Sequence, residues 1–255
     1  MSRAPQASDV LIIGGGLMGA ATAFFLRHQH GRSVTLLERE LTGRQASGVN
    51  FGNVRRQGRA LEQMPLANRA RAVWGRAREL LGEDLEFAPL GHLRVCYTAE
   101  QAATLEQHAA DARPLGLELE LLSAAMLRQR YGFFSDEVVA GSLSPVDGHA
   151  NPRLAGPAFA RAARRAGAAV FEHKQVLQVE RDGSGFIAHT ADGERYRGEQ
   201  LLVTAGAWSG PLAAAYGEPV PLTAHGPQMG VTEPVAYAIG PSIGVSSPIN
   251  VEGLY

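Results

Sequence analysis

Residues 9–19 read DVLIIGGGLMG, and this stretch decides the expected fold. The apolar, β-branched run at its start is typical of a strand that is buried on both faces of a sheet. Three glycines follow it, and helix-forming residues then run to Gly31, where the helix is expected to end. Residues 33–38, SVTLLE, predict the next strand, so the first forty residues indicate a βαβ unit.

The glycines of this unit each meet one need of dinucleotide binding. Gly14 permits a tight turn out of the strand, Gly16 lets a pyrophosphate approach the backbone, and Gly19 lets the helix pack closely. The start of the helix would present free N–H groups and a positive dipole end to the phosphates. Glu38, which ends the second strand, can accept hydrogen bonds from the ribose hydroxyls and would repel a 2′-phosphate. The pattern disfavours NADP, and it does not by itself separate NAD from FAD.

The composition is that of a globular chain with one large domain or two ordinary ones. The sequence has 255 residues, of which 45% are hydrophobic and 19% are charged, and a formal net charge of -1. This charge balance argues against nucleic acid or an anionic membrane as the main partner. Glycines interrupt the apolar run of residues 10–26, which excludes a transmembrane segment there and argues against a secretion signal. We therefore expect a cytoplasmic protein.

The thiol and imidazole groups do not suggest a reactive centre. Cys96, the single cysteine, lies in an expected strand and is interpreted as a buried structural thiol. His92 and His149 are interpreted as structural hydrogen-bonding groups. The spacing of histidines, cysteine and acidic residues predicts no metal site.

Residues 39–58 form a long, polar, glycine-rich segment, which favours a functional loop. Ser47 and Gly48 offer a hydroxyl and an N–H to phosphate or ribitol groups. Arg55 and Arg56 are candidates for binding a substrate carboxylate, because arginine holds one in a bidentate fork. The alternative, that these arginines are solvated or bind the phosphates of the cofactor, stays open.

The rest of the chain alternates between expected helices and strands. Asn151 and Pro152 form an N-cap and first-turn pair that predicts a helix to about residue 165. The strand expected at residues 200–204 is followed by a second glycine turn, where a ligand could meet the ends of parallel strands. The other expected elements are helices over 65–81, with Leu66 on its apolar face, and 99–115; a helix capped by Ser123; strands at 85–97, 117–122, 138–143, 168–172 and 175–180; and hairpin turns at 182–183 and 192–193.

In this order, the motifs resemble the D-amino acid oxidase (DAO) superfamily of FAD-dependent oxidoreductases, most closely sarcosine oxidase β-subunits and amino-acid or opine dehydrogenase subunits. The resemblance covers essentially the whole chain. It rests on DVLIIGGGLMG, LLERE, ASGVNFGNVRRQG, GHLRV, DGHANPRLAGPAFARAARRAGA, KQVLQVE and LLVTAGAWSGPLA. It implies an α/β fold in which a discontinuous Rossmann-like FAD-binding domain of the GR2 type (1–83 and 149–218) carries an inserted α+β substrate-binding domain (84–148 and 219–255).

The resemblance also assigns roles by position, with FAD as the cofactor. Arg55 would grip the carboxylate of the substrate. The residues expected to bind the cofactor are Gly14, Gly16, Gly19 and Glu38 at the ADP part; Arg39 near the adenosine; Ser47 and Gly48 at the pyrophosphate or ribitol; Val176 beside the adenine, through its backbone; and Ala205, Gly206 and Trp208 along the FAD.

The activity that the resemblance implies is oxidation of the C–N bond of a small amino or imino acid, such as sarcosine, glycine, a D-amino acid or an opine, by hydride transfer to flavin. A partner subunit or another electron acceptor would reoxidise the flavin. Family members continue beyond residue 255, so we expect the chain to be truncated at its C-terminus and both domains to be incomplete. Two alternatives stay open: a non-catalytic fragment of such a flavoprotein, and a flavoprotein that acts on a hydroxy acid or a polyol phosphate.

Overall fold

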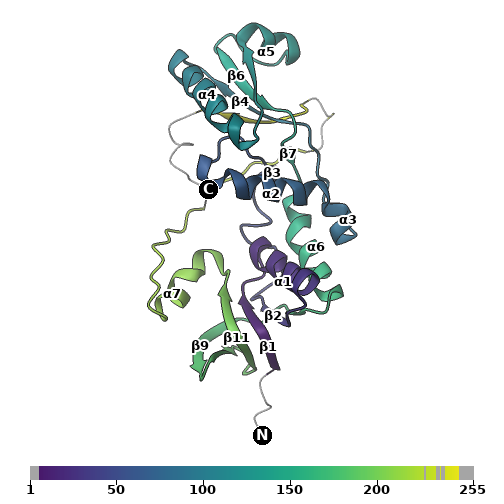
Figure 1. The fold of residues 1–255 in the computed structure, drawn as a ribbon, viewed down its shortest axis with the longest axis vertical. Helices are drawn as coiled ribbons and strands as arrows, with labels where there is room; N and C mark the ends of the chain where they lie inside the picture. Colours follow the sequence, from purple (N-terminus) through teal and green to yellow (C-terminus); the bar gives the residue numbers. More distant parts are fainter. Residues whose placement is uncertain (1–5, 227, 234–235, 237–238, 247–255) are drawn as a thin grey trace. The chain divides into compact units, whose positions relative to one another are not determined.

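The computed structural model describes residues 6–226, 228–233, 236 and 239–246, and the chain divides into two compact units (Figure 1). Unit 1 comprises residues 1–51, 81–85 and 151–230. Unit 2 comprises residues 52–80, 86–150 and 231–255, so it includes a segment that the sequence analysis grouped with the first domain. The assignment of one domain to the cofactor and the other to the substrate stays a prediction.

Unit 1 is built on a six-stranded sheet in the order β8-β2-β1-β11-β10-β9. The first four strands in this order are parallel, and β10 and β9 continue the sheet in antiparallel pairing. The strands are β1 (Gln6–Ile13), β2 (Val34–Leu37), β8 (Ala169–Phe171), β9 (Val176–Asp182), β10 (Gly185–Thr190) and β11 (Arg195–Val203). The parallel strands confirm the expected Rossmann-like α/β class.

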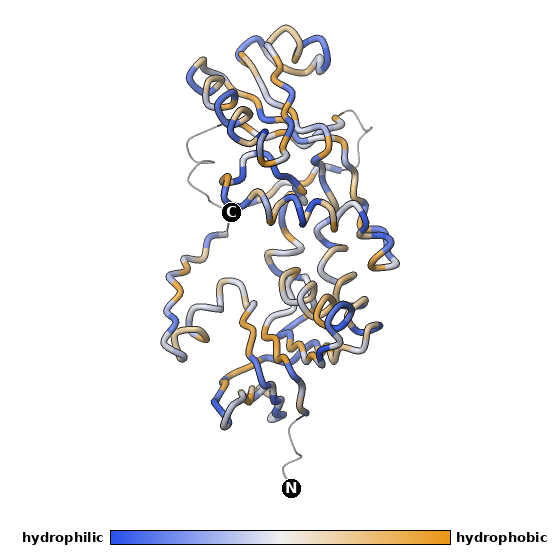
Figure 2. Tube along the Cα trace, in the orientation of Figure 1, coloured by the Kyte–Doolittle hydropathy of each residue, from blue (hydrophilic) through white to orange (hydrophobic). Residues whose placement is uncertain are grey.

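The core of unit 1 forms where helices α1 (Leu17–His30) and α6 (Pro152–Arg165) pack together and cover the sheet (Figure 1). Every residue of β2 is buried, and so are Val10–Ile13 of β1, which belong to an apolar stretch of the trace in Figure 2. The rings of Phe24 and Phe159 meet edge to face between the two helices, 5.9 Å apart. Apolar burial of this kind is the main favourable contribution to the stability of such a unit.

The predicted ends of the two helices are confirmed. Gly31 follows α1 in the left-handed conformation, with φ at 63°. The side chain of Asn151 accepts a hydrogen bond from the N–H of Arg153, 3.0 Å away, and Pro152 opens α6. Both hairpin turns are confirmed as well, since β9, β10 and β11 are joined through Gly183 and Gly193. Unit 1 also contains η3 (Gly206–Trp208) and α7 (Ser209–Ala214).

Unit 2 contains a four-stranded sheet in the order β12-β4-β6-β5 and a two-stranded ribbon, β3 with β7. Its strands are β3 (Asn53–Val54), β4 (His92–Cys96), β5 (Glu120–Ser123), β6 (Ala140–Ser144), β7 (Gly148–His149) and β12 (Ser242–Val245). An apolar cluster that includes Leu93, Leu127 and Leu143 lies on one face of the larger sheet. Cys96 is fully buried in β4, as predicted.

The helices of unit 2 confirm some predicted boundaries and correct others. Its helical segments are η1 (Leu61–Gln63), α2 (Met64–Gly75), α3 (Ala77–Leu81, whose last residue belongs to unit 1), α4 (Ala99–Ala112), η2 (Arg113–Leu115) and α5 (Ala124–Arg130). Ser123 caps α5 as predicted, by accepting a hydrogen bond from the N–H of Met126. In the described part of the chain, no helix combines the length and apolarity needed to cross a membrane.

The single helix predicted over residues 65–81 is wrong, because the chain breaks at Arg76 between α2 and α3. Gly75 precedes the break, and glycine destabilises a helix interior by about 1 kcal/mol relative to alanine. The predicted apolar face is also wrong at Leu66, which is 72% exposed, whereas Met64 is fully buried. Which face of this helix is buried depends on its packing against other parts of the fold. The apolar periodicity of the segment alone does not predict that packing.

Candidate functional site

The glycine turn after β1 is held so tightly that side chains would not fit in it. Gly14 has a φ of 107°, and a Cβ at this position would overlap the carbonyl of Thr204. A Cβ at Gly19 would overlap the carbonyl oxygen of Gly14, because α1 starts directly against the turn. The structure therefore confirms the tight turn predicted at Gly14 and the close helix packing predicted at Gly19.

The start of α1 offers a place for phosphate groups. Helix geometry leaves the first N–H groups of α1 without intrahelical acceptors, and the hydroxyl of Ser47 accepts one of them, from Leu17, at 2.9 Å. A Cβ at Gly16 would meet one described atom within 4 Å, the same Ser47 hydroxyl. The backbone at Gly16 therefore lies open beside the positive end of the helix dipole, an arrangement that fits a pyrophosphate.

The carboxylate of Glu38 is fixed at the end of β2 by two backbone groups. Its Oε2 accepts a hydrogen bond from the N–H of Gly15 at 2.7 Å, and its Oε1 accepts one from the N–H of Glu40 at 2.8 Å. A carboxylate has about four lone-pair sites, so sites remain for two ribose hydroxyls. The sequence analysis did not single out Gly15, although its place in the run of three glycines was a signal that it lay in the turn.

The loop that follows β2 is tied down over this turn by contacts that the sequence analysis missed. The N–H of Gly43 donates to the carbonyl of Gly15 at 2.8 Å. The N–H and hydroxyl of Thr42 both donate to Glu172, just beyond β8, at 2.8 Å, and Arg164 of α6 pairs with the same carboxylate at 3.2 Å. No local motif marks these partners, because Thr42 and Glu172 are 130 residues apart.

The second glycine turn lies beside the first. Strands β1 and β11 are parallel neighbours, with Ile13 opposite Val203. The hydroxyl of Thr204 donates to the carbonyl oxygen of Gly14 at 2.8 Å, and it also lies 3.1 Å from that of Ile13. The ends of the two strands therefore meet at one place, as the strand-to-turn pattern predicted, and Ala205 and Gly206 follow directly from it.

Two predicted cofactor residues touch each other at this place. The guanidinium carbon of Arg39 lies 4.2 Å from the centre of the Trp208 ring, in a cation–π contact. Trp208 keeps 51% of its surface exposed, so part of its indole ring is open to a ligand. Arg39 follows β2 and Trp208 follows β11, so the contact joins two segments that are far apart in the sequence.

The remaining predicted cofactor residues have specific neighbours in unit 1. Val176 is the first residue of β9, and two residues before it the N–H of Lys174 donates to the carbonyl of Glu38 at 2.7 Å. The N–H of Gly48, which we expected to face a phosphate, donates to the carbonyl of Gln45 at 2.8 Å. The roles of all these residues toward a cofactor stay predictions.

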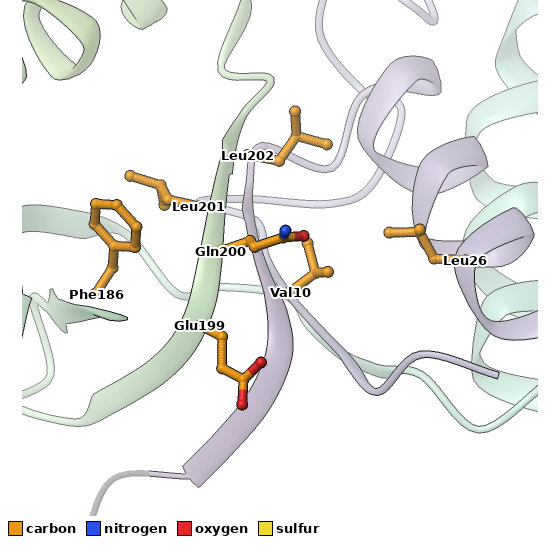
Figure 3. Close-up of a pocket in the computed structure, with 7 residues that line it drawn as sticks. All are labelled: Val10, Leu26, Phe186, Glu199, Gln200, Leu201 and Leu202. Carbon is orange, nitrogen blue, oxygen red and sulfur yellow. The ribbon is translucent and has the colours of Figure 1, made fainter. Parts of the chain in front are cut away.

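A pocket of about 470 Å³ opens beside the second half of β11 (Figure 3). Its lining residues are Val10, Leu26, Phe186, Glu199, Gln200, Leu201 and Leu202. None of the predicted cofactor residues lines it, so it is distinct from the glycine turns. The pocket lies along residues 199–202 of β11, beyond Gly198, which is the last residue of β11 that pairs with β10.

In unit 2, the two arginines that were candidates for carboxylate binding have different partners. The side chain of Arg56, which is 12% exposed, pairs with the fully buried Asp147 at 3.1 Å. Asp147 also accepts hydrogen bonds from the backbone N–H groups of Arg56 and Gln57, at 2.8 and 3.1 Å. Arg56 is thus held in a structural ion pair. Arg55 is half-buried, and its Nη1 donates to the carbonyl of Gln57 at 2.5 Å.

Gln57 lies at the centre of a buried polar cluster that the sequence analysis did not identify. Its side-chain nitrogen donates to the carbonyl of Ser142 at 3.0 Å and its oxygen lies 3.2 Å from Nδ1 of His92. Burial, and after it the charge of the nearby Arg55, lowers the pKa of His92 to about 4. His92 is therefore neutral at pH 7 and bonded to Gln57, in agreement with its predicted structural role. The described residues contain no group of histidine, cysteine and acidic side chains that could hold a metal ion.

Known proteins resemble this chain in both sequence and fold. The sequence family described as DAO, FAD dependent oxidoreductase, matches residues 9–254. The glycine oxidase of Geobacillus kaustophilus (strain HTA426) is 30% identical over 217 residues, which cover 82% of this chain and 57% of that protein. Its crystal structure covers 83% of this chain and 59% of that one, with a TM-score of 0.76 and 27% identity.

A second relative is the 4-methylaminobutanoate oxidase (formaldehyde-forming) of Paenarthrobacter nicotinovorans, which is 28% identical over 221 residues. The match covers 86% of this chain and 27% of that protein. The chain thus spans less than two thirds of the length of each of these two relatives.

Proposed function

Because the chain belongs to the DAO family of FAD-dependent oxidoreductases, we propose that it oxidises the C–N bond of a small amino or imino acid. The observation that carries the proposal is the pair of glycine turns at Gly14 and Gly206, joined through Thr204 and flanked by Glu38. Such a turn at the carboxyl ends of parallel strands is where α/β sheets bind dinucleotides.

The residues of unit 1 fit the adenosine diphosphate part of FAD. The open backbone at Gly16 and the start of α1 would receive the pyrophosphate, and Glu38 would accept hydrogen bonds from the ribose. Trp208 and Arg39, already stacked on each other, would flank the cofactor. When bound, FAD supplies the two-electron oxidant for the carbon–hydrogen bond next to the substrate nitrogen.

The names of the relatives and the position of Arg55 support the proposed substrate class. One relative is named a glycine oxidase and the other a 4-methylaminobutanoate oxidase. Each name denotes a small molecule that carries both an amine and a carboxylate. The guanidinium group of Arg55 would hold the carboxylate and so orient the amine-bearing carbon. Loss of the C–H and N–H hydrogens would give an imine, which water would hydrolyse to a carbonyl compound and an amine.

The test is to purify the protein, measure its bound flavin by absorbance and add substrates without oxygen. Sarcosine, glycine, D-alanine and an opine form one set of compounds, and lactate and glycerol 3-phosphate form the comparison set. We expect a yellow protein whose flavin absorbance is bleached by a member of the first set and by neither compound of the second. A protein without flavin, or a flavin that no amino or imino acid reduces, contradicts the proposal.

A further inference from the structure

The segment that joins β8 to β9 stays paired with the residues that follow β2. The N–H of Lys174 donates to the carbonyl of Glu38 at 2.7 Å, and the N–H of His173 donates to the carbonyl of Glu40 at 3.0 Å. Val176, which we expect beside the adenine, follows two residues later as the first residue of β9. Lys174 is therefore bonded to one residue that we expect to bind the adenosine and lies two residues from another.

The backbone takes up an uncommon conformation directly before Lys174. His173 has a φ of 57°, in the left-handed region that residues other than glycine rarely adopt. Such conformations persist where the surrounding contacts hold them. Here the hydrogen bonds to Glu38 and Glu40 hold the chain on both sides of the His173 α-carbon. The course of the backbone at Lys174 is thus set by its partners and not by local preference.

The side chain of Lys174 joins this segment to the turn between β10 and β11. Its ammonium group donates to the carboxylate of Asp192 and lies 2.7 Å from Oε2 of Glu194. Hydrogen bonds to Asp192 and then to Glu194 raise the pKa of Lys174, and Lys174 in turn lowers the pKa of Asp192 to about 2. Lys174 is the only lysine of the sequence. Its compact ammonium group, with three donors, suits two adjacent carboxylates better than a planar guanidinium group does.

Glu194 is itself held by the core of unit 1. The hydroxyl of Tyr196 donates to its Oε2. Tyr196 is 3% exposed, and its ring lies 5.1 Å from that of Phe171, the last residue of β8. Val176 packs against the apolar cluster that contains Tyr196 and Leu37. The lysine is therefore anchored, through Glu194, to the same core against which Val176 packs.

We propose that Lys174 is a positioning residue for the adenosine part of FAD. The inference rests on the proposed function, since it takes the carboxylate of Glu38 as the acceptor for the ribose hydroxyls. The backbone of Lys174 is bonded to Glu38, and its side chain is anchored to the β10–β11 turn. Lys174 thereby holds Glu38 and Val176 in fixed relative positions before the cofactor binds. Groups that are ordered in advance bind a ligand more tightly, because binding does not have to order them.

The test measures nucleotide binding and does not depend on turnover. FAD and ADP are titrated by calorimetry into the full chain after its flavin has been removed. We expect Lys174→Met to weaken the binding of both nucleotides by about 10-fold, because both carry the adenosine. Arg197→Met is the matched control. It breaks an ion pair of Arg197 in β11 with Asp182 in β9, 2.9 Å long, at the other end of β10, and it should bind both nucleotides as the wild type does.

A double-mutant cycle with Glu38 separates positioning from a general loss of stability. If Lys174 acts through Glu38, Lys174→Met should weaken FAD binding much less in a Glu38→Ala background than in the wild type. A lysine that only stabilises the fold would weaken it by the same factor in both backgrounds. Lys174→Arg keeps the charge and should recover part of the affinity, and Asp192→Asn, which weakens the same ion cluster from the other side, should lower it.

The inference is overturned if Lys174→Met binds FAD and ADP as the wild type does, if it loses affinity for FAD but not for ADP, or if the wild type does not bind ADP. Equal effects of Lys174→Met in the two backgrounds of the cycle also overturn it. Failure of the proposed function looks different: no amino acid reduces the flavin, while Lys174→Met still weakens the binding of ADP.

Discussion

Glu38 accepts a hydrogen bond from the backbone N–H of Gly15, with 2.7 Å between Oε2 and the nitrogen. The carboxylate that ends the second strand is thereby fixed to the glycine turn that ends the first strand. One side chain thus serves the geometry of the turn and, in our proposal, the ribose of the cofactor. The effects of substitution at Glu38 should reflect both roles.

We expect Glu38→Ala to lower FAD affinity by about 10- to 100-fold, because hydrogen bonds to a charged group contribute roughly 1.5–3 kcal/mol. Fluorescence titration of the apoprotein with FAD measures the change. Glu40→Ala is the matched control, since Glu40 lies two residues away and faces Arg44 and Gln45. Equal losses in the two variants would show that the position of Glu38 is not special.

Gly19 in α1 and Gly31, which follows this helix, should differ in their tolerance of a methyl group. Gly19→Ala places a Cβ on the carbonyl oxygen of Gly14, so we expect loss of stable folding or of bound flavin. Gly31→Ala has no described atom within 4 Å of the new Cβ, and its φ of 63° should destabilise the protein by about 1–2 kcal/mol. Chemical denaturation of both variants makes the comparison, and similar losses would contradict the close packing at Gly19.

The hydroxyl of Thr204 should couple the two glycine turns. Thr204→Val keeps the shape of the side chain but removes the hydrogen bonds to the carbonyls of Ile13 and Gly14. We expect the free energy of unfolding to fall by about 1 kcal/mol and FAD binding to weaken with it. Thr204→Ser, which restores the hydroxyl, should recover most of the flavin affinity. If the serine variant binds FAD no better than the valine variant, the hydroxyl does not position the turn.

Burial of neutral His92 should make stability depend on pH. Its pKa falls from the usual 6.5 to about 4 in the folded protein, mainly through burial. The unfolded chain therefore takes up a proton as the pH falls below 6.5, while the folded chain does not until about pH 4. The stabilising contribution is complete above pH 6.5 and is lost across this window, by about 3 kcal/mol in total.

Urea denaturation at pH 7, 5.5 and 4.5 measures this effect. His92→Gln should show a shallower loss of the free energy of unfolding than the wild type between these pH values. His30→Gln, which changes an exposed histidine at the end of α1, should keep the slope of the wild type. An unchanged slope in His92→Gln would mean that His92 takes up its proton in the folded protein as readily as in the unfolded chain.

Arg55 should act on the substrate and not on the flavin. We expect Arg55→Ala to raise the KM for the amino acid by about 10- to 100-fold, since a charge-assisted contact is lost. The ratio of FAD to protein should stay that of the wild type. Steady-state kinetics and flavin absorbance of the same preparation give both values. A parallel loss of flavin and of substrate binding would assign Arg55 to the cofactor instead.

The parts of unit 1 that the sequence predicted depend on local patterns. The strand–glycine–helix–strand order at residues 9–38, the cap at Asn151 and the two hairpin glycines are each encoded within a few residues, and all are confirmed. The family and its FAD cofactor were also predicted from such motifs, and the match over residues 9–254 confirms them. Patterns of this kind suffice because turn and cap residues have specific backbone requirements.

The parts that the sequence did not predict depend on contacts between distant segments. Nothing near Thr42 indicates that Glu172 will accept its hydrogen bonds, and nothing near Gln57 indicates His92 as its partner. Strand β11 begins at Arg195, before the apolar run that predicted it, because its first residues pair with β10 through their backbone. Such hydrogen bonds and strand pairs join segments that are distant in the sequence, so they can be identified only from the three-dimensional structure.

The parallel pairing of Ile13 in β1 with Val203 in β11 also constrains the order in which the protein can fold during its synthesis. Between these two paired residues the ribosome must add residues 14–202, which include most of unit 2, and this takes roughly 10–40 s at about 5–20 residues per second. Throughout that interval, the edge of β1 that pairs with β11 has no partner, and the contact of Thr204 with Gly14 cannot form. A nascent chain of this kind is exposed to aggregation for longer than one whose sheet neighbours are adjacent in the sequence.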